Sequence, residues 1–537
     1  MDAINQVDVL FIGAGPASLA GAIRAKQLLN AAGRTESVVV IEKSEKVGQH
    51  ILSGLVFESE ALDELIPDWR DHHDEFVTKA LASAVERDDT VFLAGPSRAM
   101  KLPEFVVPGY MRNRGKFILS GSEMVVWLTK EAEAIGVRVY PGFAATEVVY
   151  DGRRVAGVKL GDRGLDRDGR QQVNHVPGET ITAKVTVFGE GSLGQLAEDV
   201  IRRNGLANGA NPQIYSVGVK EIVKLPADNA FGANHVVHTF GYPLPRLFGG
   251  GTIYSMNQNT VAVALVMGLD WKYADLNPYL ELQRFKAHAY IANLLAGGET
   301  IAYGAKTLPE GGYYSLPQPY TDGALIVGDA AGFTDVRKLK GWHNAMRSGM
   351  LAGQAIAAAI AADDFSAAGL KAYDDLLRAS PVIRDLRKGR NYRQVFSKGG
   401  SVYVGAPLSL LQGLVPWKIG TEPDFAALKR QARLNHDGNG FSDRLTGVAL
   451  SGTIHREEEP SHITIAEPGK CVECGEIYGE RACVNFCPGE VYEFVDGQLV
   501  IAPSNCLHCQ TCRAKCPEQV ILWHVPEGGE GPKYKAM

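Results

Sequence analysis

The eight cysteines of this 537-residue chain all lie between Cys471 and Cys516, and the residues before them contain none. Disulfides of a secreted protein are spread through its fold, whereas a dense run of thiols favours metal binding in a reducing compartment. The distribution therefore predicts a separate C-terminal module that holds a metal through thiolates. The module comes after a long cysteine-free region, which has enough apolar residues for a core of its own.

The cysteines form two runs, each of which ends in Cys-Pro. In the second run, two residues separate Cys506 from Cys509 and Cys509 from Cys512, and three separate Cys512 from Cys516. This is the spacing of bacterial ferredoxins, in which the last cysteine of each run binds the cluster of the other run. The spacing predicts two ligand sets: a first set of Cys487, Cys506, Cys509 and Cys512, and a second set of Cys471, Cys474, Cys483 and Cys516.

The identity of these metal sites has alternatives. Structural zinc sites also use four thiolates, but the Cys-Pro endings and the regular spacing favour iron-sulfur clusters. Eight residues separate Cys474 from Cys483, a looser spacing than in the second run. We expect a 4Fe-4S cluster on the first set, and either a 4Fe-4S or a three-iron cluster on the second.

A short apolar strand, a glycine-rich turn and a helix follow one another at the N-terminus. The strand covers residues 7–12, the turn covers residues 13–18, and a second strand over residues 37–41 ends in an acid. This order is typical of a βαβ unit that binds a dinucleotide.

Four residues of this unit are candidate cofactor contacts. Gly13 permits the tight turn, and Gly15 lets the backbone approach a pyrophosphate at the positive end of the helix. Ser18 replaces the third glycine of the pattern, and Glu42 is placed to accept a hydrogen bond from a ribose hydroxyl.

A second glycine-rich turn, from Gly189 to Gly194, follows the strand-like residues 184–188. One helix and a loop come next, without the strand ending in an acid that a further dinucleotide site requires. We interpret this segment as the returning strand of the first nucleotide domain, so no NAD(P) site is predicted.

A third apolar strand ends at Asp329, and a helix rich in small residues begins near Gly341. Asp329 is suited to bind a ribityl hydroxyl. The helix N-terminus from Gly341 to Asn344 is suited to face the electron-rich edge of a flavin. An aspartate after a strand is commonly only a helix cap. Because it follows a βαβ unit here, we interpret it as the third element of an FAD-binding fold.

These elements predict an α/β chain: a two-dinucleotide FAD-binding fold (Rossmann-like, glutathione reductase type) with an inserted antiparallel β domain and a C-terminal ferredoxin-like iron-sulfur domain. The inserted domain rests on alternating apolar residues over 212–317. The expected boundaries are 1–100, 135–200 and 318–380 for FAD binding, 201–317 with 101–134 for the inserted domain, 381–440 for a connecting segment and 441–537 for the iron-sulfur domain.

Charge and hydropathy exclude other classes. A net charge of -6 offers no basic surface for nucleic acid, and no run of 18 uncharged apolar residues predicts a transmembrane helix. The first residues have neither a basic signal region nor an Arg/Ser-rich transit stretch, so we expect neither a signal peptide nor a transit peptide.

Residues 401–420 are apolar but interrupted by glycine and proline. Composition alone favours a buried hairpin for this segment over a face in a lipid interface.

Several motifs of this chain resemble those of a known family. They cover residues 13–18, 50–54, 184–194, 249–251, 301–305, 340–346, 448–455, 487–493 and 526–529. With them the chain resembles the electron transfer flavoprotein-ubiquinone oxidoreductase family, including bacterial relatives tied to nitrogen fixation, over essentially its whole length.

The resemblance implies a monotopic enzyme at the cytoplasmic face of a bacterial inner membrane, which passes electrons from reduced electron transfer flavoprotein to ubiquinone or menaquinone. The inserted domain is then the quinone domain, with Gly249 and Gly250 at the quinone site. Ser53, Gly54 and Asn344 match positions near the flavin. Residues 401–420, in the connecting segment, are then membrane-facing. No general base or nucleophile is required for electron transfer, so no catalytic residue is assigned.

The resemblance also covers the first cysteine set, which matches the ligands of the family's single cluster. The familiar members lack the thiols of the second set, so a second cluster and a longer electron path are expected here, as in the two-cluster companions of electron-bifurcating assemblies. Two alternatives stay open. One is a ferredoxin-fed reductase of a lipid-like alkene, similar to geranylgeranyl reductases, and the other is an electron-relay subunit of a larger complex.

Overall fold

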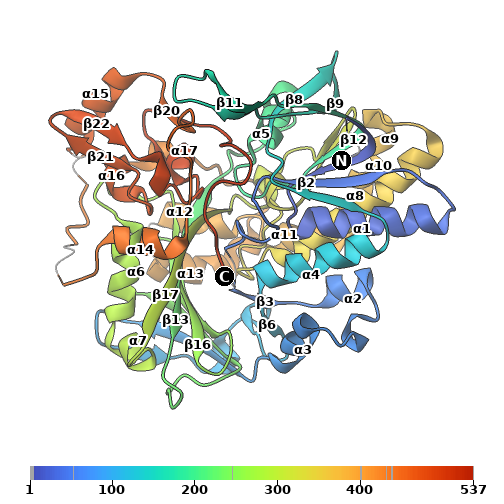
Figure 1. The fold of residues 1–537 in the computed structure, drawn as a ribbon. Coiled ribbons are helices and arrows are strands. Elements are labelled where there is room, and N and C mark those ends of the chain that lie inside the picture. Colours follow the sequence, from blue (N-terminus) through green and yellow to red (C-terminus); the bar gives the residue numbers. More distant parts are fainter. Residues whose placement is uncertain are drawn as a thin grey trace.

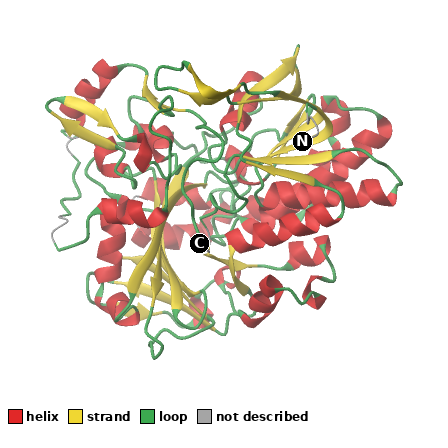
Figure 2. Cartoon of the chain, viewed as in Figure 1, coloured by secondary structure: helices red, strands yellow, loops and turns green. Residues whose placement is uncertain are grey.

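The computed structural model describes residues 5–52, 54–244, 246–399, 402–430, 432–436, 440–479 and 481–535. Two large sheets with their own helices form the body of the chain, and the C-terminal module packs beside the second sheet (Figures 1 and 2). Ser53, expected near the flavin, lies outside the described residues.

The first sheet contains the nucleotide-binding elements. Its strand order is β18 (Tyr320–Thr321), β19 (Ala324–Ile326), β12 (Thr180–Phe188), β1 (Gln6–Ile12), β2 (Val38–Glu42) and β7 (Arg138–Pro141). All neighbours from β19 to β7 are parallel, so their carboxyl ends meet at one edge. An antiparallel hairpin of β8 (Ala145–Asp151) and β9 (Arg154–Leu160) adds to β12. Residues 184–188 are thus the returning strand that the sequence predicts.

Helix α1 (Pro16–Ala31) packs against α8 (Trp342–Ala362) beside this sheet (Figure 1). A Cβ atom on Gly349 would lie 1.9 Å from the carbonyl oxygen of Ala17, and one on Gly21 would lie 2.9 Å from that of Gly349. The close approach explains the small residues of α8, because side chains at these positions would separate the two helices.

The second sheet has the strand order β17 (Glu299–Pro309), β13 (Tyr215–Lys224), β16 (Thr260–Gly268), β15 (Gly249–Ser255), β14 (His235–Gly241), β4 (Arg87–Leu93) and β5 (Ala99–Lys101). Its pairs are antiparallel except for β14 and β4, which are parallel. Helices α6 (Pro278–Ala287) and α7 (Ala289–Leu294) cover its outer side (Figure 1).

Two of the expected domain boundaries differ from this architecture. Strand β4 and most of β5 lie before residue 101, yet they extend the second sheet rather than the FAD-binding part. Conversely, α4 (Gly121–Ala134) packs against α1, although residues 101–134 were assigned to the inserted domain. The inserted sheet is also mixed rather than purely antiparallel. These differences arise from contacts between segments far apart in the sequence, which local patterns do not report.

Smaller elements connect the sheets. They are the strand pairs β3 (Gly54–Phe57) with β6 (Phe117–Ser120) and β10 (Arg163–Leu165) with β11 (Gln171–Val176), and the helices α2 (Glu60–Leu65), α3 (Glu75–Ala82), α5 (Gln195–Arg203), α9 (Ala367–Leu370) and α10 (Ala372–Ala379).

The C-terminal module is built of short elements around the cysteines: α14 (Arg444–Ser451), β20 (Ile463–Ile465), α15 (Pro468–Tyr478), α16 (Ala482–Phe486), β21 (Tyr492–Val495), β22 (Gln498–Ile501), α17 (Thr511–Lys515) and β23 (Ile521–Trp523). It shares one hydrophobic core with the second sheet. The buried Tyr303 hydroxyl of β17 donates to the carbonyl oxygen of Pro488 at 3.0 Å, which ties the two parts together.

The connecting segment is helical. It contains α11 (Pro381–Lys388), α12 (Tyr392–Gly399) and α13 (Val402–Leu411), and the last helix has Pro407 inside it. The hairpin expected within residues 401–420 is therefore wrong. Among the described residues, no helix is both long enough and apolar enough to cross a bilayer.

Candidate functional site

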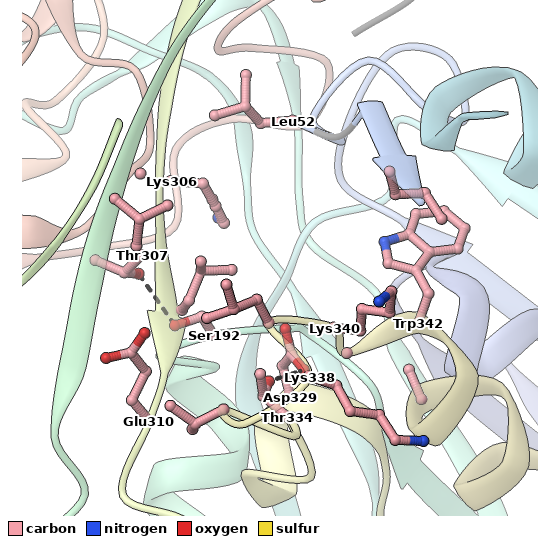
Figure 3. A pocket seen from close by; sticks show the side chains of 18 of the residues that line it. Leu52, Ser192, Lys306, Thr307, Glu310, Asp329, Thr334, Lys338, Lys340 and Trp342 are labelled. Atoms are coloured by element: carbon pink, nitrogen blue, oxygen red, sulfur yellow. Dashed lines mark hydrogen bonds between the residues drawn. The ribbon is translucent and has the colours of Figure 1, made fainter. Parts of the chain in front are cut away.

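One large cavity, with a volume of about 810 Å³, lies between the two sheets and the C-terminal module (Figure 3). Its wall includes the turn after β1, the ends of β2 and β12, the start of α8, one face of the second sheet, and Gln510 and Trp523 of the module. A cavity of this size is large enough for a cofactor and a second ligand in contact.

The glycine turn after β1 closes against the segment after β12. Gly13 has a φ angle of +87°, and a Cβ atom there would lie 2.9 Å from the carbonyl oxygen of Gly189. Glycine is therefore required at this position. Glu42 accepts from the backbone N–H groups of Ala14 and Ser44, each at 2.9 Å, which fixes its carboxylate at the end of β2. Gly13, Gly15 and Glu42 all line the cavity.

Ser18 does not line the cavity, although it was expected to contact the cofactor. Ser18 is fully buried, and a Cβ atom on Gly189 would lie 2.1 Å from its hydroxyl oxygen. Ser18 therefore packs α1 against the turn after β12, which is the role of the third glycine in this motif. Gly54 begins β3, and its neighbour Leu55 lines the cavity.

The second glycine-rich turn belongs to the same cavity. Gly189, Gly191 and Gly194 line it together with Gly13. The Glu190 carboxylate accepts from the N–H groups of Leu196 and Ala197 at 3.1 and 2.7 Å and so caps α5. The second glycine-rich turn therefore makes the contacts expected of a segment that completes the first nucleotide domain.

Asp329, labelled in Figure 3, lies beside Gly341, the residue that precedes α8. The Asp329 carboxylate accepts from the Thr334 hydroxyl at 2.8 Å, and burial raises its pKa. Gly341 precedes the first helical residue, and a Cβ atom on it would lie 3.4 Å from Asp329 Oδ1. Asn344 is buried behind this wall, where its amide donates to the carbonyl oxygen of Phe333 at 2.9 Å. Asn344 thus holds the loop before α8 rather than lining the cavity.

Gly249 and Gly250 lie in the sheet that forms the opposite wall. A Cβ atom added to Gly249 would lie 2.2 Å from the carbonyl oxygen of Val266, and one added to Gly250 would lie 2.3 Å from that of Thr239. A side chain at either position would displace a neighbouring strand, so the glycines shape the wall itself.

Beside these glycines, polar side chains cross the same face of the sheet. Lys220 is paired with Ala264, Ala264 with Thr252, and Thr252 with His238, and paired residues point to one face. Burial lowers the pKa of Lys220 to about 7, and its ammonium has no hydrogen-bond partner in the described part of the chain. A buried polar group of this kind needs an acceptor, so it marks a position for a ligand oxygen.

Exposed apolar side chains surround one end of the cavity. Leu410 of α13 and Val106 are 68% and 51% exposed, and both also line the cavity wall. Phe105, Leu411, Leu414 and Trp417 extend this apolar surface and are more than half exposed. The buried interpretation of residues 401–420 does not hold for these leucines.

The structure brings the first cysteine set together as buried, disulfide-free thiols. Burial raises the pKa of Cys506 to about 12, and the neighbouring Cys509 and Cys487 add to this effect. Burial and Cys509 likewise raise the pKa of Cys487 to about 11. Four thiols this close repel one another as thiolates unless they share a cation, which suits an iron-sulfur cluster.

The second cysteine set also gathers as the crossover pattern predicts. Burial raises the pKa of Cys474 to about 12, and Cys516 and Cys471 add to this effect. Cys516 has the same influence on Cys471 and on Cys483. Cys516 therefore lies with the first run of cysteines and Cys487 with the second.

A single layer of side chains separates the first cysteine set from the cavity. The backbone N–H of His508 donates to the Cys506 sulfur at 3.4 Å. The His508 ring lies 5.2 Å from the ring of His50, which lines the cavity. Lys306 lines it too and donates to the His508 carbonyl oxygen at 3.2 Å. Electrons leaving the first set have a short path to a cofactor in the cavity.

Sequence reasoning missed several buried polar residues of this region. The ring nitrogens of His455, His462 and His508 lie within 4.8 Å of one another, next to the first cysteine set. Lys220 and Lys340 line the cavity. Lys340 and His455 lie within motifs of the resemblance, but no local pattern assigns them a role.

Comparisons with protein families agree with these sites. The family described as electron transfer flavoprotein-ubiquinone oxidoreductase, 4Fe-4S, matches residues 439–535, and the family described as ETF-QO, ubiquinone-binding, matches residues 215–308. The first match contains both cysteine sets, and the second contains Gly249, Gly250 and Lys220.

Relatives with curated names extend over the whole chain. Electron transfer flavoprotein-ubiquinone oxidoreductases from Dictyostelium discoideum (mitochondrial) and Pseudomonas aeruginosa are each 38% identical to it, and the alignments cover 99% of this chain and 91% and 99% of those proteins. The human mitochondrial protein is 37% identical, over 99% of this chain and 89% of its own length.

Solved structures share the fold. A geranylgeranyl bacteriochlorophyll reductase-like protein from Thermoplasma acidophilum has a TM-score of 0.56 at 20% identity and covers 78% of this chain and 93% of its own. A variant of the flavin-dependent brominase Bmp2 has a TM-score of 0.51 at 18% identity, with 77% and 96% covered. At these identities the likeness concerns the fold alone.

The predicted fold class is confirmed: an α/β flavoprotein fold with a C-terminal iron-sulfur domain of ferredoxin type. A 4Fe-4S cluster is likewise confirmed as a cofactor, and the buried thiols fit it. The fold and the glycine turn after β1 fit FAD. The family matches and the full-length relatives lead to one conclusion: the chain belongs to the electron transfer flavoprotein-ubiquinone oxidoreductase family.

Proposed function

We propose that this chain transfers electrons from reduced electron transfer flavoprotein to ubiquinone or menaquinone. The observation that carries the proposal is the single cavity. It joins the glycine turn after β1 to Gly249 and Gly250 in the ubiquinone-binding match, and only one layer of side chains separates it from Cys506. A carrier of single electrons and a two-electron acceptor thus meet in one protein.

Each part of the chain has a defined task in this transfer. Bound FAD supplies a centre that takes electrons singly and gives them up in pairs, and an iron-sulfur cluster carries one at a time. The turn at Gly13 and Gly15 would hold the FAD pyrophosphate, and the start of α8 would offer its positive end to the bound cofactor. Around the first cysteine set, the Thr511 hydroxyl lies 3.4 Å from the Cys509 sulfur, a contact of the kind that tunes a cluster's potential.

The second cysteine set is proposed to hold another iron-sulfur cluster. Cys471, Cys474, Cys483 and Cys516 supply one complete set of four thiols, separate from the first set. Cys471 and Cys483 are partly exposed, whereas all four thiols of the first set are buried. We infer that this outer cluster receives electrons from the donor and passes them inward.

The chain is proposed to work as a peripheral, monotopic protein at the cytoplasmic face of a bacterial inner membrane. Support comes from the apolar surface around Leu410 and Val106, which adjoins the cavity as a quinone entrance requires. An apolar surface of this kind favours partial insertion into a lipid interface.

The two alternatives are not favoured. The likeness to a geranylgeranyl reductase-like protein rests on 20% identity, against 38% to oxidoreductases of this family over the whole chain. A relay subunit without a quinone site would have no need of the ubiquinone-binding match or of a cavity that reaches an apolar surface.

The test is anaerobic quinol formation by the purified protein. Reduced electron transfer flavoprotein is supplied as donor and a short-chain ubiquinone or menaquinone as acceptor, and FAD, iron and sulfide are measured in the same sample. We expect quinol in proportion to the flavin content. A chain loaded with flavin and iron that forms no quinol with either acceptor would refute the proposal.

A further inference from the structure

A partly buried cluster of charged side chains forms the cavity wall between the start of α8 and the second sheet. Glu58 lies at its centre, with the Lys116 ammonium at 2.9 Å, that of Lys338 at 3.1 Å and that of Lys340 at 3.9 Å. Glu58, Lys338 and Lys340 line the cavity, and the Glu58 and Lys340 side chains are each 9% exposed. Figure 3 shows that both lysines come from the loop before α8.

The cluster reaches the sheet through Asn113. The Lys340 ammonium donates to the Asn113 side-chain oxygen at 2.8 Å, and the Asn113 nitrogen lies 3.4 Å from Nδ1 of His238. His238 lines the cavity on β14, and its neighbour in the pairing, Thr252, lies two residues after Gly250. Lys340 thus stands between the flavin side of the cavity and the strand that carries the quinone-site glycines.

The same cluster extends outward. The Lys338 ammonium lies 3.5 Å from the Asp385 carboxylate, which also pairs with Lys388 at 3.3 Å. The Lys388 side chain is 61% exposed. Ionisable groups less than 4 Å apart therefore lead from the aqueous surface to Lys340.

The surroundings of Lys340 suit proton transfer near neutral pH. Burial and the Lys116 and Lys338 ammonium groups together lower its pKa to about 7, against the Glu58 carboxylate, which raises it. Burial also lowers the pKa of His238 to about 4 and of His343 to about 3, so neither ring competes for the proton. A general acid is most effective when its pKa lies near the working pH.

Glu58 has a different role. Burial opposes its ionisation, but His343, Lys116 and Lys338 outweigh this effect and lower the Glu58 pKa to about 2. It remains a carboxylate and orients the ammonium groups around it. Asp88, which accepts from Asn113 at 3.0 Å, does the same for the amide that holds Lys340.

We propose that Lys340 is the proton donor to the quinone headgroup bound against β14 and β15, with Glu58 and Asn113 as its positioning residues. This inference rests on the proposed function. Conversion of a quinone to a quinol adds two electrons and two protons. The electrons come from the reduced carrier through the chain's redox centres. Lys340 gives up one N–H proton at a time to a quinone oxygen and regains it from water.

A purely structural role makes a different prediction. If the cluster only fixed the loop before α8, a residue that keeps the positive charge would suffice. Lys340→Arg keeps the charge for Glu58 and Asn113, but arginine does not release its proton in proteins. Lys340→Gln removes both charge and proton. Lys371→Gln is the matched control, because Lys371 is exposed and pairs with Asp375 on α10.

The experiment compares two acceptors with the flavin- and iron-loaded protein. Quinol formation from a short-chain ubiquinone requires protons, whereas reduction of ferricenium takes one electron and no proton. Both are followed anaerobically with reduced electron transfer flavoprotein between pH 6 and 9, together with flavin content and equilibrium quinone affinity. In the unmodified chain we expect quinol formation to decline as pH rises through about 7, and ferricenium reduction to stay level.

For Lys340→Gln and Lys340→Arg we expect quinol formation to fall by about 10²-fold or more and to lose its pH step, with ferricenium reduction, flavin content and quinone affinity retained. Lys371→Gln should match the unmodified chain. Quinol formation by Lys340→Arg at the unmodified rate, or an equal loss with both acceptors, would overturn the inference. If Lys340→Gln does not load flavin, Lys340→Arg alone decides. Absence of quinol from the unmodified chain would instead refute the proposed function.

Discussion

Arg393 on α12 offers a measurable test of what holds the apolar helix α13 in place. Its guanidinium, 1% exposed, donates to both oxygens of Asp270 at 2.6 and 3.0 Å and to Glu310 at 3.0 Å. It also faces the Phe248 ring at 4.3 Å. These contacts join α12, and the apolar α13 that follows it, to the second sheet and to the cavity wall.

Replacement of Arg393 by methionine keeps much of the side-chain volume but removes the cation that pairs with Asp270 and with the buried Glu310. Breaking one buried pair costs about 3–5 kcal/mol, and we expect a loss within that range because Asp270 is partly exposed. Arg393 holds the Asp270 pKa low against the effect of burial, so without Arg393 this pKa rises, and the variant carries the cost of an uncompensated carboxylate or of its protonation. Arg378→Met, which breaks an exposed pair with Asp374 on α10, is the control and should cost about 0.3–0.5 kcal/mol.

The assay is urea unfolding of the loaded protein, followed by tryptophan fluorescence and by flavin release. In the triple variant Arg393→Met, Asp270→Asn, Glu310→Gln most of the loss should be recovered, because no unpaired charge remains buried. If Arg393→Met unfolds with the same free energy as Arg378→Met, the buried pairs do not stabilise this junction and the reasoning is wrong.

Further predictions concern the cofactors, the membrane and the cavity. Cys474→Ala should lower the iron content from about eight to about four per chain with FAD retained; an unchanged content near four in both chains would remove the second cluster. Gly13→Ala should purify with little FAD, since its Cβ atom would lie 2.9 Å from the Gly189 carbonyl oxygen, and an unchanged flavin absorbance would contradict this. Leu410→Glu should weaken sedimentation with phosphatidylethanolamine–phosphatidylglycerol vesicles by roughly tenfold or more, because a buried leucine contributes about 1.5–3 kcal/mol; Val173→Glu, on the exposed hairpin β10–β11, is the control. Without FAD, the unmodified chain should gain thermal stability as pH rises from about 7 towards 10.5, because the folded-state pKa of Lys220 is lowered and the unfolded chain binds the extra proton. Lys220→Met should have a smaller slope, because Lys43 and Lys340 still contribute to it, and a slope equal in both chains would show that Lys220 does not contribute.

The sequence predicts the parts of this molecule that depend on local spacing. The turn from Gly13 to Ser18 and the crossover of Cys487 and Cys516 are set by residues close together in the chain, and the structure reproduces both. Strands β4 and β5 were placed in the wrong sheet, because β4 pairs with β14 almost 150 residues away along the chain. The hairpin expected in residues 401–420 was wrong for a related reason: glycine and proline were interpreted as breaks, but Pro407 lies inside α13.

The charged cluster around Lys340 was beyond the reach of sequence patterns for another reason. Glu58 follows β3, Lys116 precedes β6, and Lys340 precedes α8, so their three segments meet only in the folded chain. In a sequence, a single lysine or glutamate is most often a solvent-exposed surface residue. Its burial, and hence its chemistry, is a property of the cavity.

In the described part of the chain, five lysines and five carboxylates line the cavity, and their burial has a consequence for assembly. Burial lowers the pKa of Lys43 to about 8 and also lowers that of Lys306, while it raises the pKa of Glu190 and of Asp329. Lysine ammonium groups in such surroundings are costly unless a negative charge lies nearby. A cofactor with a pyrophosphate supplies that charge on one side of the cavity, and thiolates bound to iron supply it on the other, next to Lys306. Loading of either centre therefore lowers the cost of the lysines that face the other, so cofactor binding and folding of this region reinforce each other.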